Sequence, residues 1–309
     1  MQPTDSVLPL LINIAGSVCL LLWGSFTVRS SVERAFASRL NQLVSRASTA
    51  SFAAVTAGLA AAIVMQSATA TILLSTSLIS AGTLSLTSAI GVVLGADLGS
   101  VIAARILFID LSLLPPLLLI AGITLHLLSS TWRRRYLGRI LVGLGLMLMA
   151  ILWIKQIITP LTATPLPPDW LSVLSSVPWF SLLVFAILTW FAHSSVAVVL
   201  VIAALDQSGL LPLSLSVPML LGANIGAGLI ALPMVGGRET GPRAVVLCNL
   251  GLRISMAVAL LLVLPWALEY PIFLTATPGA RIVLLHIVFN LLLVILFVPI
   301  AGGLVNALH

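Results

Sequence analysis

The sequence predicts an all-α polytopic membrane protein that is built from two related halves, and three observations carry this prediction. Of the 309 residues, 60% are hydrophobic and 7% are charged, a composition that no soluble domain of this length tolerates on its surface. The apolar stretches are long and lack the alternation of a lipid-facing barrel strand, so we expect helical spans. Polar segments that interrupt the apolar stretches recur at a fixed offset, which indicates an internal repeat.

About seven stretches are long enough to cross a bilayer, which takes about 20 helical residues. The predicted spans are residues 7–28, 85–107, 113–130, 137–158, 212–234, 244–264 and 280–302. Two further apolar segments, 47–82 and 173–208, each carry a polar break near the middle. We expect each to form a re-entrant helical hairpin, which returns to the side of the membrane from which it enters. The whole chain, 1–309, is thus predicted to be a single transmembrane domain.

The distribution of charge predicts a multi-pass protein of the cell membrane with its N-terminus outside and its C-terminus cytoplasmic. In this orientation one face holds most of the arginines, and the positive-inside rule makes that face cytoplasmic. They are Arg29, Arg34, Arg39, Arg46, Arg133, Arg134, Arg135, Arg139, Arg238 and Arg243. The opposite loops hold Asp5, Asp110, Asp169, Asp206 and Glu269, with Arg281 and Lys155 as basic exceptions. The net charge of +6 is therefore a topology signal for a chain surrounded by lipid, and not a sign of nucleic-acid binding.

A duplication relates the two halves. Gln-Ser-Ala-Thr-Ala at 66–70 corresponds to His-Ser-Ser-Val-Ala at 193–197, an offset of 193 − 66 = 127 residues. The same offset relates two more pairs, Gly82 with Gly209 and Gly-Ala-Asp-Leu-Gly at 95–99 with Gly-Ala-Asn-Ile-Gly at 222–226. Three matches in register favour a duplication over coincidence.

The repeat boundaries and their orientation follow from this offset. We expect repeat 1 over about 7–130, repeat 2 over about 137–264, and an extra C-terminal span at 280–302. Because the two predicted hairpins enter from opposite faces, the repeats should be inverted. Inverted repeats can form a central site and expose it alternately to either side of the membrane.

The polar breaks are candidate binding sites. A helix that is interrupted within the membrane has free N–H groups at one broken end and free carbonyls at the other. Hydroxyls beside positive helix ends suit an anion such as phosphate, whereas carboxylate, amide and carbonyl oxygens suit a small cation. Packing is the alternative role for membrane serines and threonines, but the matched positions of Gln66-Ser67 and Ser194-Ser195 favour binding.

Two ionisable residues within predicted spans also favour a functional site. Asp97 is costly in hydrocarbon unless it is protonated, paired or bound to a cation, and Asn224 is its partner in the repeat. Arg253 should lie near mid-depth, where it either faces the substrate or pairs with Asp97. Its counterpart under the offset is His126, for which a polar role is a weaker expectation.

These segments resemble the type II sodium/phosphate cotransporter family, whose halves each carry a Gln-Ser-Ser-Ser-Ala-Thr-like hairpin motif and a Gly-Ala-Asn-Ile-Gly-Thr element. Residues 66–71 and 95–100 match the first pair, and residues 193–197 and 222–227 match the second. Two further segments are similar to the family, Arg243 to Arg253 and His-Ile-Val-Phe-Asn at 286–290, which runs into Pro299. The resemblance covers roughly residues 7–300 and does not include the PhoU-like C-terminal domain of many bacterial members.

The resemblance implies a secondary active transporter, not an enzyme, that takes up inorganic phosphate with sodium by alternating access and uses no cofactor. The hairpin tips would form the anion site, and neighbouring oxygens would hold Na⁺ as the only metal ion. The substrate-binding residues are accordingly predicted to be Gln66, Ser67, Thr69, His193, Ser194, Ser195 and Arg253. The predicted ion-binding residues are Gln66, Thr71, Asp97, Ser100 and Asn224. A homodimer is the assembly considered.

Departures from the family pattern leave alternatives open. His193, Ala68 and Asp97 replace a glutamine, a serine and an asparagine, and Ser100 and Ala227 replace threonines. Each change alters an oxygen ligand, and a titratable His193 would allow proton coupling, so a proton-coupled transporter or one for another anion is the first alternative. A scaffold or a carrier of a lipid-linked phosphate is another.

An intramembrane serine/histidine hydrolase is the least favoured alternative. It would use His193 as base and Ser194 or Ser195 as nucleophile. Adjacent residues rarely satisfy the geometry of a nucleophile and its base, and the chain has no Gly-x-Ser-x-Gly elbow.

Overall fold

The computed structural model describes residues 4–46, 51–107, 113–158, 177–235, 240–267, 277–301 and 303. In this part of the chain all regular secondary structure is helical, which confirms the all-α prediction. The helices are α1 (Thr4–Ser45), α2 (Ser51–Met65), α3 (Ala68–Ser80), α4 (Leu86–Leu107), α5 (Leu114–Leu128), α6 (Trp132–Ile158), α8 (Pro178–Ala192), α9 (Ser195–Gln207), α10 (Leu213–Ala231), the 3₁₀ turn η2 (Leu232–Met234), α11 (Thr240–Ala267) and α12 (Ala280–Phe297).

Six of the described helices are long and apolar enough to cross a membrane, namely α1, α4, α6, α10 with η2, α11 and α12. The seventh predicted span, 113–130, forms the shorter helix α5, which has 15 residues and packs along α6, and its crossing of the membrane stays a prediction. At 1.5 Å per residue α5 is about 22 Å long, whereas the hydrocarbon core is about 30 Å thick. The helix begins with two prolines in its first turn and ends at Ser129, whose backbone is extended.

The first helix is longer than predicted. The expected span at 7–28 is the first part of α1, which continues without a break to Ser45 over 42 residues. Arg29, Arg34 and Arg39 therefore lie on a helix and not in a loop. No proline or glycine follows Val28 before the end of α1, so nothing in the sequence ends the helix at the arginines.

The duplication extends to the helix boundaries. Adding 127 to the bounds of α2, α3 and α4 gives 178–192, 195–207 and 213–234, which are the bounds of α8, α9 and of α10 with η2. The close contacts repeat as well. A Cβ atom on Gly95 would lie 2.0 Å from the Val55 carbonyl oxygen, and one on Gly222 would lie 2.1 Å from that of Leu182. Both glycines thus let their helix approach the first hairpin arm at the same place in each repeat.

Each predicted hairpin contains two helices that meet at the polar break. The arms α2 and α3 have 15 and 13 residues, as do α8 and α9, so each arm is shorter than a membrane crossing requires. These lengths suit insertion to partial depth, which stays a prediction. Residues 47–50 and 173–176 of the predicted hairpins, and residue 302 of the last predicted span, lie outside the described residues.

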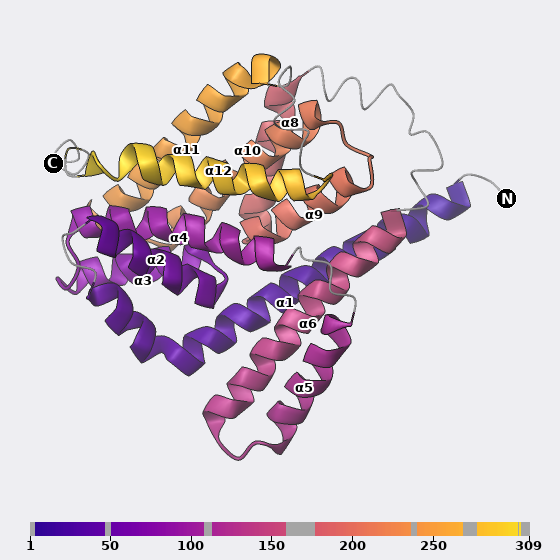
Figure 1. The fold of residues 1–309 in the computed structure, drawn as a ribbon, viewed down its shortest axis with the longest axis horizontal. Coiled ribbons are helices and arrows are strands. Elements are labelled where there is room, and N and C mark those ends of the chain that lie inside the picture. The colour runs from indigo at the N-terminus through magenta and orange to yellow at the C-terminus, as the bar shows by residue number, and fades with distance from the viewer. Residues whose placement is uncertain are drawn as a thin grey trace.

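The two repeat units lie on either side of the molecule (Figure 1). Helices α2, α3 and α4 pack together on one side, and α8, α9 and α10 on the other. The long helix α1 packs along α6, and α5 pairs with α6 to form a projecting arm. Helix α12 crosses both units and contacts α4 and α9. The C-terminal helix therefore joins the two repeats.

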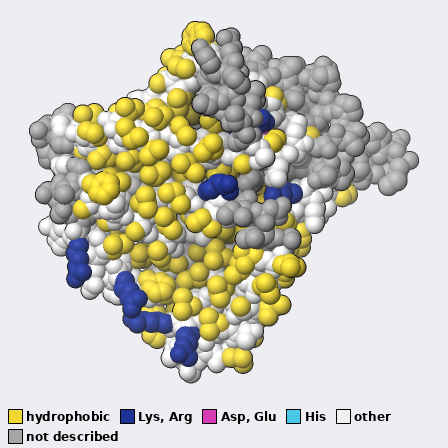
Figure 2. All heavy atoms as spheres, in the orientation of Figure 1, with side chains coloured by type: hydrophobic (Ala, Val, Ile, Leu, Met, Phe, Trp, Pro, Cys, Tyr) yellow, Lys and Arg dark blue, Asp and Glu magenta, His cyan; other side chains and the backbone are white. Residues whose placement is uncertain are grey.

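The surface is predominantly apolar. Figure 2 shows hydrophobic side chains over most of one face, with basic side chains along its lower left edge and at a few points near its middle. Large apolar side chains are exposed on α5, α8 and α12, among them Leu117, Ile120, Phe180, Phe191 and Ile295. A continuous apolar surface of this extent suits contact with lipid, and the protein is a multi-pass membrane protein.

Arg281, one of the two basic residues on the predicted outer face, pairs with Asp206. Its Nε and Nη2 donate to the two oxygens of Asp206 at 2.8 and 2.7 Å, and the Gly279 amide donates to the same carboxylate at 2.7 Å. Asp206 is fully buried at the end of α9, and Ser216 on α10 also donates to it at 3.3 Å. This ion pair neutralises the arginine locally and ties the second hairpin to the start of α12.

Candidate functional site

The polar break of each hairpin has the same backbone geometry. Gln66 and His193 are the only described residues other than glycine with positive φ, at 49° and 52°. Each reverses the chain between the two arms. The following serine caps the second arm, since the Ser67 and Ser194 hydroxyls accept hydrogen bonds from the Ala70 and Ala197 amides at 3.1 and 3.2 Å. Each hydroxyl can still donate its own hydrogen to a ligand.

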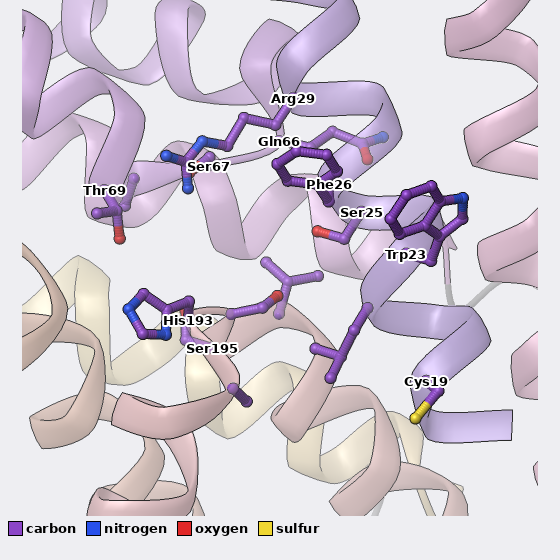
Figure 3. A pocket seen from close by; sticks show the side chains of 15 residues that line it. Cys19, Trp23, Ser25, Phe26, Arg29, Gln66, Ser67, Thr69, His193 and Ser195 are labelled. Atoms are coloured by element: carbon purple, nitrogen blue, oxygen red, sulfur yellow. The ribbon is translucent and has the colours of Figure 1, made fainter. Parts of the chain in front are cut away.

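The N-termini of α3 and α9 face one cavity of about 340 Å³. It is bounded by the two hairpin tips and by α1, and Figure 3 shows Gln66 and Ser67 on one side with His193 and Ser195 opposite. The lining residues are Cys19, Leu22, Trp23, Ser25, Phe26, Arg29, Gln66, Ser67, Ala68, Thr69, Ala192, His193, Ser194, Ser195 and Val196. The first amides of a helix have no acceptor within that helix, and the helix dipole adds partial positive charge. Two such helix ends therefore make the cavity favourable for an anion.

Arg29 adds a full positive charge to this cavity. Its side chain extends from α1 to a position beside Ser67 (Figure 3). Arg29 also pairs with Glu33 one turn along the helix, at 3.2 Å, and remains 26% exposed. From the sequence alone, Arg29 contributed only to the topology signal. Arg29 points to the hairpins because residues 29–45 continue the helix, and this continuation was not predicted.

Gln66 supplies a polar group that no described residue hydrogen-bonds. Its Oε1 is buried and has no hydrogen-bond partner among the described residues. A primary amide offers both an acceptor and two donors, and a protonated phosphate offers both hydroxyls and anionic oxygens. The His193 imidazole, by contrast, is exposed, and its Nδ1 lies 3.0 Å from the Phe191 carbonyl oxygen.

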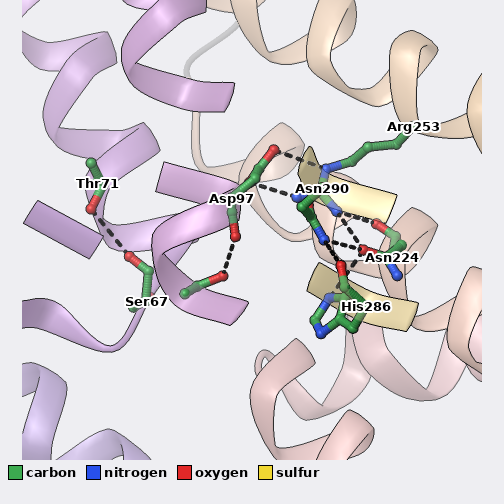
Figure 4. A network of polar contacts seen from close by, with 8 residues as sticks. Ser67, Thr71, Asp97, Asn224, Arg253, His286 and Asn290 are labelled. Atoms are coloured by element: carbon green, nitrogen blue, oxygen red, sulfur yellow. Dashed lines mark hydrogen bonds and ion pairs between the residues drawn. The ribbon is translucent and has the colours of Figure 1, made fainter. Parts of the chain in front are cut away.

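A second polar cluster lies away from the cavity, within the helix bundle. Arg253 on α11 forms an ion pair with Asp97 on α4, with Nη2 against Oδ1 and with Nε donating to Oδ2 at 3.2 Å. Its Nη1 donates to the backbone oxygen of Asn224 on α10 at 2.8 Å. Arg253 and Asp97 are 3% and 1% exposed. Figure 4 shows how the guanidinium bridges the two Gly-Ala-Asp/Asn elements of the repeat.

The side-chain oxygen of Asn224 is surrounded by N–H donors. Its Oδ1 accepts from the Asn290 amide at 3.2 Å and lies 3.1 Å from His286 Nε2 and 3.5 Å from Arg253 Nη1. Its Nδ2 donates to the Leu220 carbonyl at 2.9 Å, which fixes the orientation of the amide. A hydrogen bond from His286 to this oxygen requires the tautomer with the proton on Nε2. Both α12 residues belong to the segment 286–290, to which no role was assigned from the sequence.

The predicted substrate-binding residues divide between the two places. Six of the seven line the cavity, namely Gln66, Ser67, Thr69, His193, Ser194 and Ser195. Arg253 does not line it and pairs with Asp97, which was the second role considered for it. The counterpart His126 is partly exposed on α5, and its Nδ1 lies 3.0 Å from the Arg135 carbonyl oxygen.

The predicted ion-binding residues also divide. Gln66 lines the cavity, whereas Asp97 and Asn224 belong to the Arg253 cluster. The Thr71 hydroxyl donates to the Ser67 carbonyl at 3.2 Å, and the Ser100 hydroxyl donates to the Asp97 carbonyl at 2.9 Å. Both hydroxyls thus donate to nearby backbone carbonyls, the Thr71 hydroxyl also lies 3.7 Å from Met65 Sδ, and an ion-binding role for them stays a prediction.

Duplicated hairpins around one polar cavity, within a bundle of membrane-length helices, define the class of this protein as a membrane transport protein with internal repeats. The chain belongs to the Na⁺/Pi-cotransporter family, which it matches over residues 20–156 and 164–298. The two matched segments correspond to the two halves of the chain.

Relatives of this chain occur in several bacteria. It is 32% identical over 296 residues to the "Putative inorganic phosphate export protein YjbB" of Salmonella typhimurium, covering 94% of this chain and 54% of that protein. It is 32% identical over 292 residues to the protein of the same name from Escherichia coli K12, with coverages of 94% and 53%. The "Uncharacterized protein YqeW" of Bacillus subtilis is 27% identical over 254 residues, or 80% of each chain. The chain thus spans about half the length of the YjbB proteins, and no solved structure is significantly similar to it.

Proposed function

We propose that this protein carries inorganic phosphate across the cell membrane by alternating access. The observation that carries the proposal is the convergence of the α3 and α9 N-termini, with their capping serines and Arg29, on one cavity. Amides, hydroxyls and a guanidinium are the groups that bind oxyanions in proteins. Membership of the phosphate cotransporter family supports phosphate as the anion.

The repeat supplies the means of alternating access. In the proposed orientation the arginine-rich face is cytoplasmic and the two repeats are inverted, so that the hairpins reach the cavity from opposite sides. Movement of one unit against the other would then open the cavity to each side in turn. The cavity lies where the units meet α1, as expected for a site that both of them control.

Direction and coupling belong to the proposal as well. Sodium-coupled uptake is the direction that the family name favours, whereas the name of the YjbB relatives favours export. Proton coupling through His193 and transport of another anion are the alternatives, and a homodimer remains a prediction. A membrane carrier moves its substrate in the direction set by the sum of the gradients to which it is coupled.

Reconstitution of the whole chain in liposomes tests the proposal. Labelled phosphate should cross in both directions faster than in empty vesicles, while sodium and pH gradients are varied independently. Unlabelled sulfate serves as a competing anion, so that a sulfate carrier would be recognised. If no labelled anion crosses above the background of empty vesicles under any of these gradients, the protein is not a phosphate carrier.

Matched serine variants link the flux to the cavity. Ser67→Ala together with Ser194→Ala should reduce phosphate flux by about tenfold or more, because two donors and both helix caps are lost. Ser255→Ala is the control, since the Ser255 hydroxyl is on α11 and donates only to the Gly251 carbonyl of its own helix at 2.9 Å. Full activity of the double variant would place the anion site elsewhere.

A further inference from the structure

We propose that Arg253 is a resident cation, which takes the place of sodium between Asp97 and Asn224, so that phosphate movement through this chain does not depend on sodium. The inference rests on the proposed phosphate transport and concerns its coupling. Asp97 and Asn224 are two of the five residues at which the family resemblance predicts ion ligands. Three features of the cluster around Arg253 argue against a sodium ion between these two residues.

The first reason is that the Arg253 guanidinium already contacts the Asp97 and Asn224 oxygens that would bind a sodium ion. Arg253 donates to Asp97 Oδ2 at 3.2 Å and to the Asn224 carbonyl at 2.8 Å, and its Nη2 forms an ion pair with Asp97 Oδ1. Both carboxylate oxygens and the backbone oxygen therefore face nitrogen. A sodium ion at this point would have to displace a guanidinium that contacts all three.

The second reason is the environment of the Asn224 side chain. Its Oδ1 faces N–H groups from His286, Asn290 and Arg253, at 3.1, 3.2 and 3.5 Å. The hydrogens of these groups carry partial positive charge and repel a bound cation. Since α12 supplies two of them, the arrangement depends on the extra helix that follows the repeats.

The third reason is the balance of charge. Asp97 contributes one negative charge and Arg253 one positive charge, and both are buried with side chains 1% and 3% exposed. The pair is neutral as a unit, whereas an added Na⁺ would leave a net charge in a region of low dielectric. His126, the equivalent residue of the first repeat, is partly exposed near the end of α5, where its Nδ1 lies 3.0 Å from the Arg135 carbonyl oxygen.

This arrangement affects the direction of transport. An inward sodium gradient drives uptake only if sodium moves with the phosphate. Without that coupling, the net movement of an anion follows its own gradient and the membrane potential, and an inside-negative potential drives anions outwards. A carrier with a resident guanidinium is therefore suited to release phosphate from the cell.

Wild-type protein provides the first test. In liposomes, phosphate flux should be equal when Na⁺ is replaced by K⁺ on both sides, and it should respond to a potential set with potassium and valinomycin. In detergent, the thermal midpoint should be the same in NaCl and in KCl of equal ionic strength. Flux that increases with sodium, or a midpoint that rises with sodium over potassium, would overturn the inference.

Removal of the guanidinium provides the second test. Arg253→Met leaves the Asp97 carboxylate free for a cation, so we expect a sodium-specific rise in the thermal midpoint of about 3 °C or more. Arg281→Met is the matched control, because it also removes an arginine that pairs with a buried aspartate but leaves the Asp97 site intact. A variant Arg253→Met that folds and responds no more to sodium than the wild-type protein does would contradict the inference.

The outcomes separate this inference from the proposed function. If neither phosphate nor sulfate moves in any condition, the proposed transport is wrong, while the sodium response of the thermal midpoint still decides the role of Arg253. If Arg253→Met does not fold, the wild-type comparison of sodium with potassium decides it. If phosphate moves only with sodium, transport is correct and the resident-cation inference is wrong.

Discussion

Gln66 and His193 occupy turn positions for which glycine would be the less strained residue. A left-handed conformation costs a residue with a side chain on the order of 1 kcal/mol or more, and such residues cluster at functional sites. Both side chains line the cavity between the hairpin tips. Their positions therefore suit a role in binding better than a role in the turn itself.

Replacement of Gln66 by glycine separates these two roles. Gln66→Gly should leave the thermal midpoint unchanged or raise it slightly, because glycine adopts φ near 49° without strain. The apparent affinity for phosphate should fall by about tenfold, since a hydrogen-bonding amide is lost from the cavity. Flux and thermal unfolding measured on the same preparation check both effects. Unchanged affinity would show that Gln66 serves only the turn.

Replacement of Arg29 tests whether its positive charge contributes to anion binding in the cavity. Arg29→Gln should lower the apparent affinity for phosphate by about tenfold, because a charge-assisted contact to the anion is lost. Arg34→Gln is the control, since Arg34 is exposed on the same helix and donates to the Tyr136 hydroxyl at 3.2 Å rather than lining the cavity. Concentration dependence of labelled phosphate flux measures both variants. Equal affinities would remove Arg29 from the site.

At the scale of helices, the approach of α4 to α2 depends on glycine. A Cβ on Gly95 would lie 2.0 Å from the Val55 carbonyl, so the two helices would have to separate. Gly95→Ala should therefore destabilise the protein by about 1–3 kcal/mol, as over-packing does in other tightly packed interiors. Thermal unfolding in detergent measures this loss.

Gly251 on α11 is the matched control for this helix contact. Its added Cβ would meet nothing within 4 Å, so Gly251→Ala should change stability by less than about 1 kcal/mol in either direction. Gly222→Ala should behave like Gly95→Ala, because it is the equivalent position in the second repeat. Tolerance of alanine at both positions would mean that the helices can separate without cost.

The hairpin arms and α5 show which features of the helices could be predicted from the sequence and which could not. The breaks at Gln66-Ser67 and His193-Ser194 are visible as polar residues in apolar stretches, and a serine followed by a helical segment is a recognisable cap. The length of α5 is not visible in this way, because apolar residues continue up to Leu128 and the hydropathy stays high. The apolar composition of a stretch does not by itself show how much of that stretch lies in lipid.

At the scale of the whole molecule, inversion of the repeats is the prediction with the widest consequences. Ser80 and Gln207 are equivalent positions, since 80 + 127 = 207, and both are exposed at the ends of the second hairpin arms. With Cys19 and Cys248 replaced by serine, Ser80→Cys should react with an impermeant maleimide only from the cytoplasmic side. Gln207→Cys should react only from outside.

Arg134→Cys is the control for this labelling. Arg134 is exposed beside the α5–α6 turn, which the positive-inside rule makes cytoplasmic, so it should behave like Ser80→Cys. Labelling of Ser80→Cys and Gln207→Cys from the same side would show parallel repeats and would remove the proposed basis of alternating access.

The sequence by itself determined the helical membrane class, the duplication at an offset of 127 residues and the pairing of the two hairpin tips, because each depends on composition or local pattern. Only the tertiary structure decided that Arg29 reaches the hairpin cavity and that Arg253 joins Asp97 and Asn224 away from it. These contacts join residues that are far apart in the chain, and they depend on the length of α1 and the crossing of α11 and α12. Local patterns fix which helices form, whereas the packing of those helices fixes which charges meet.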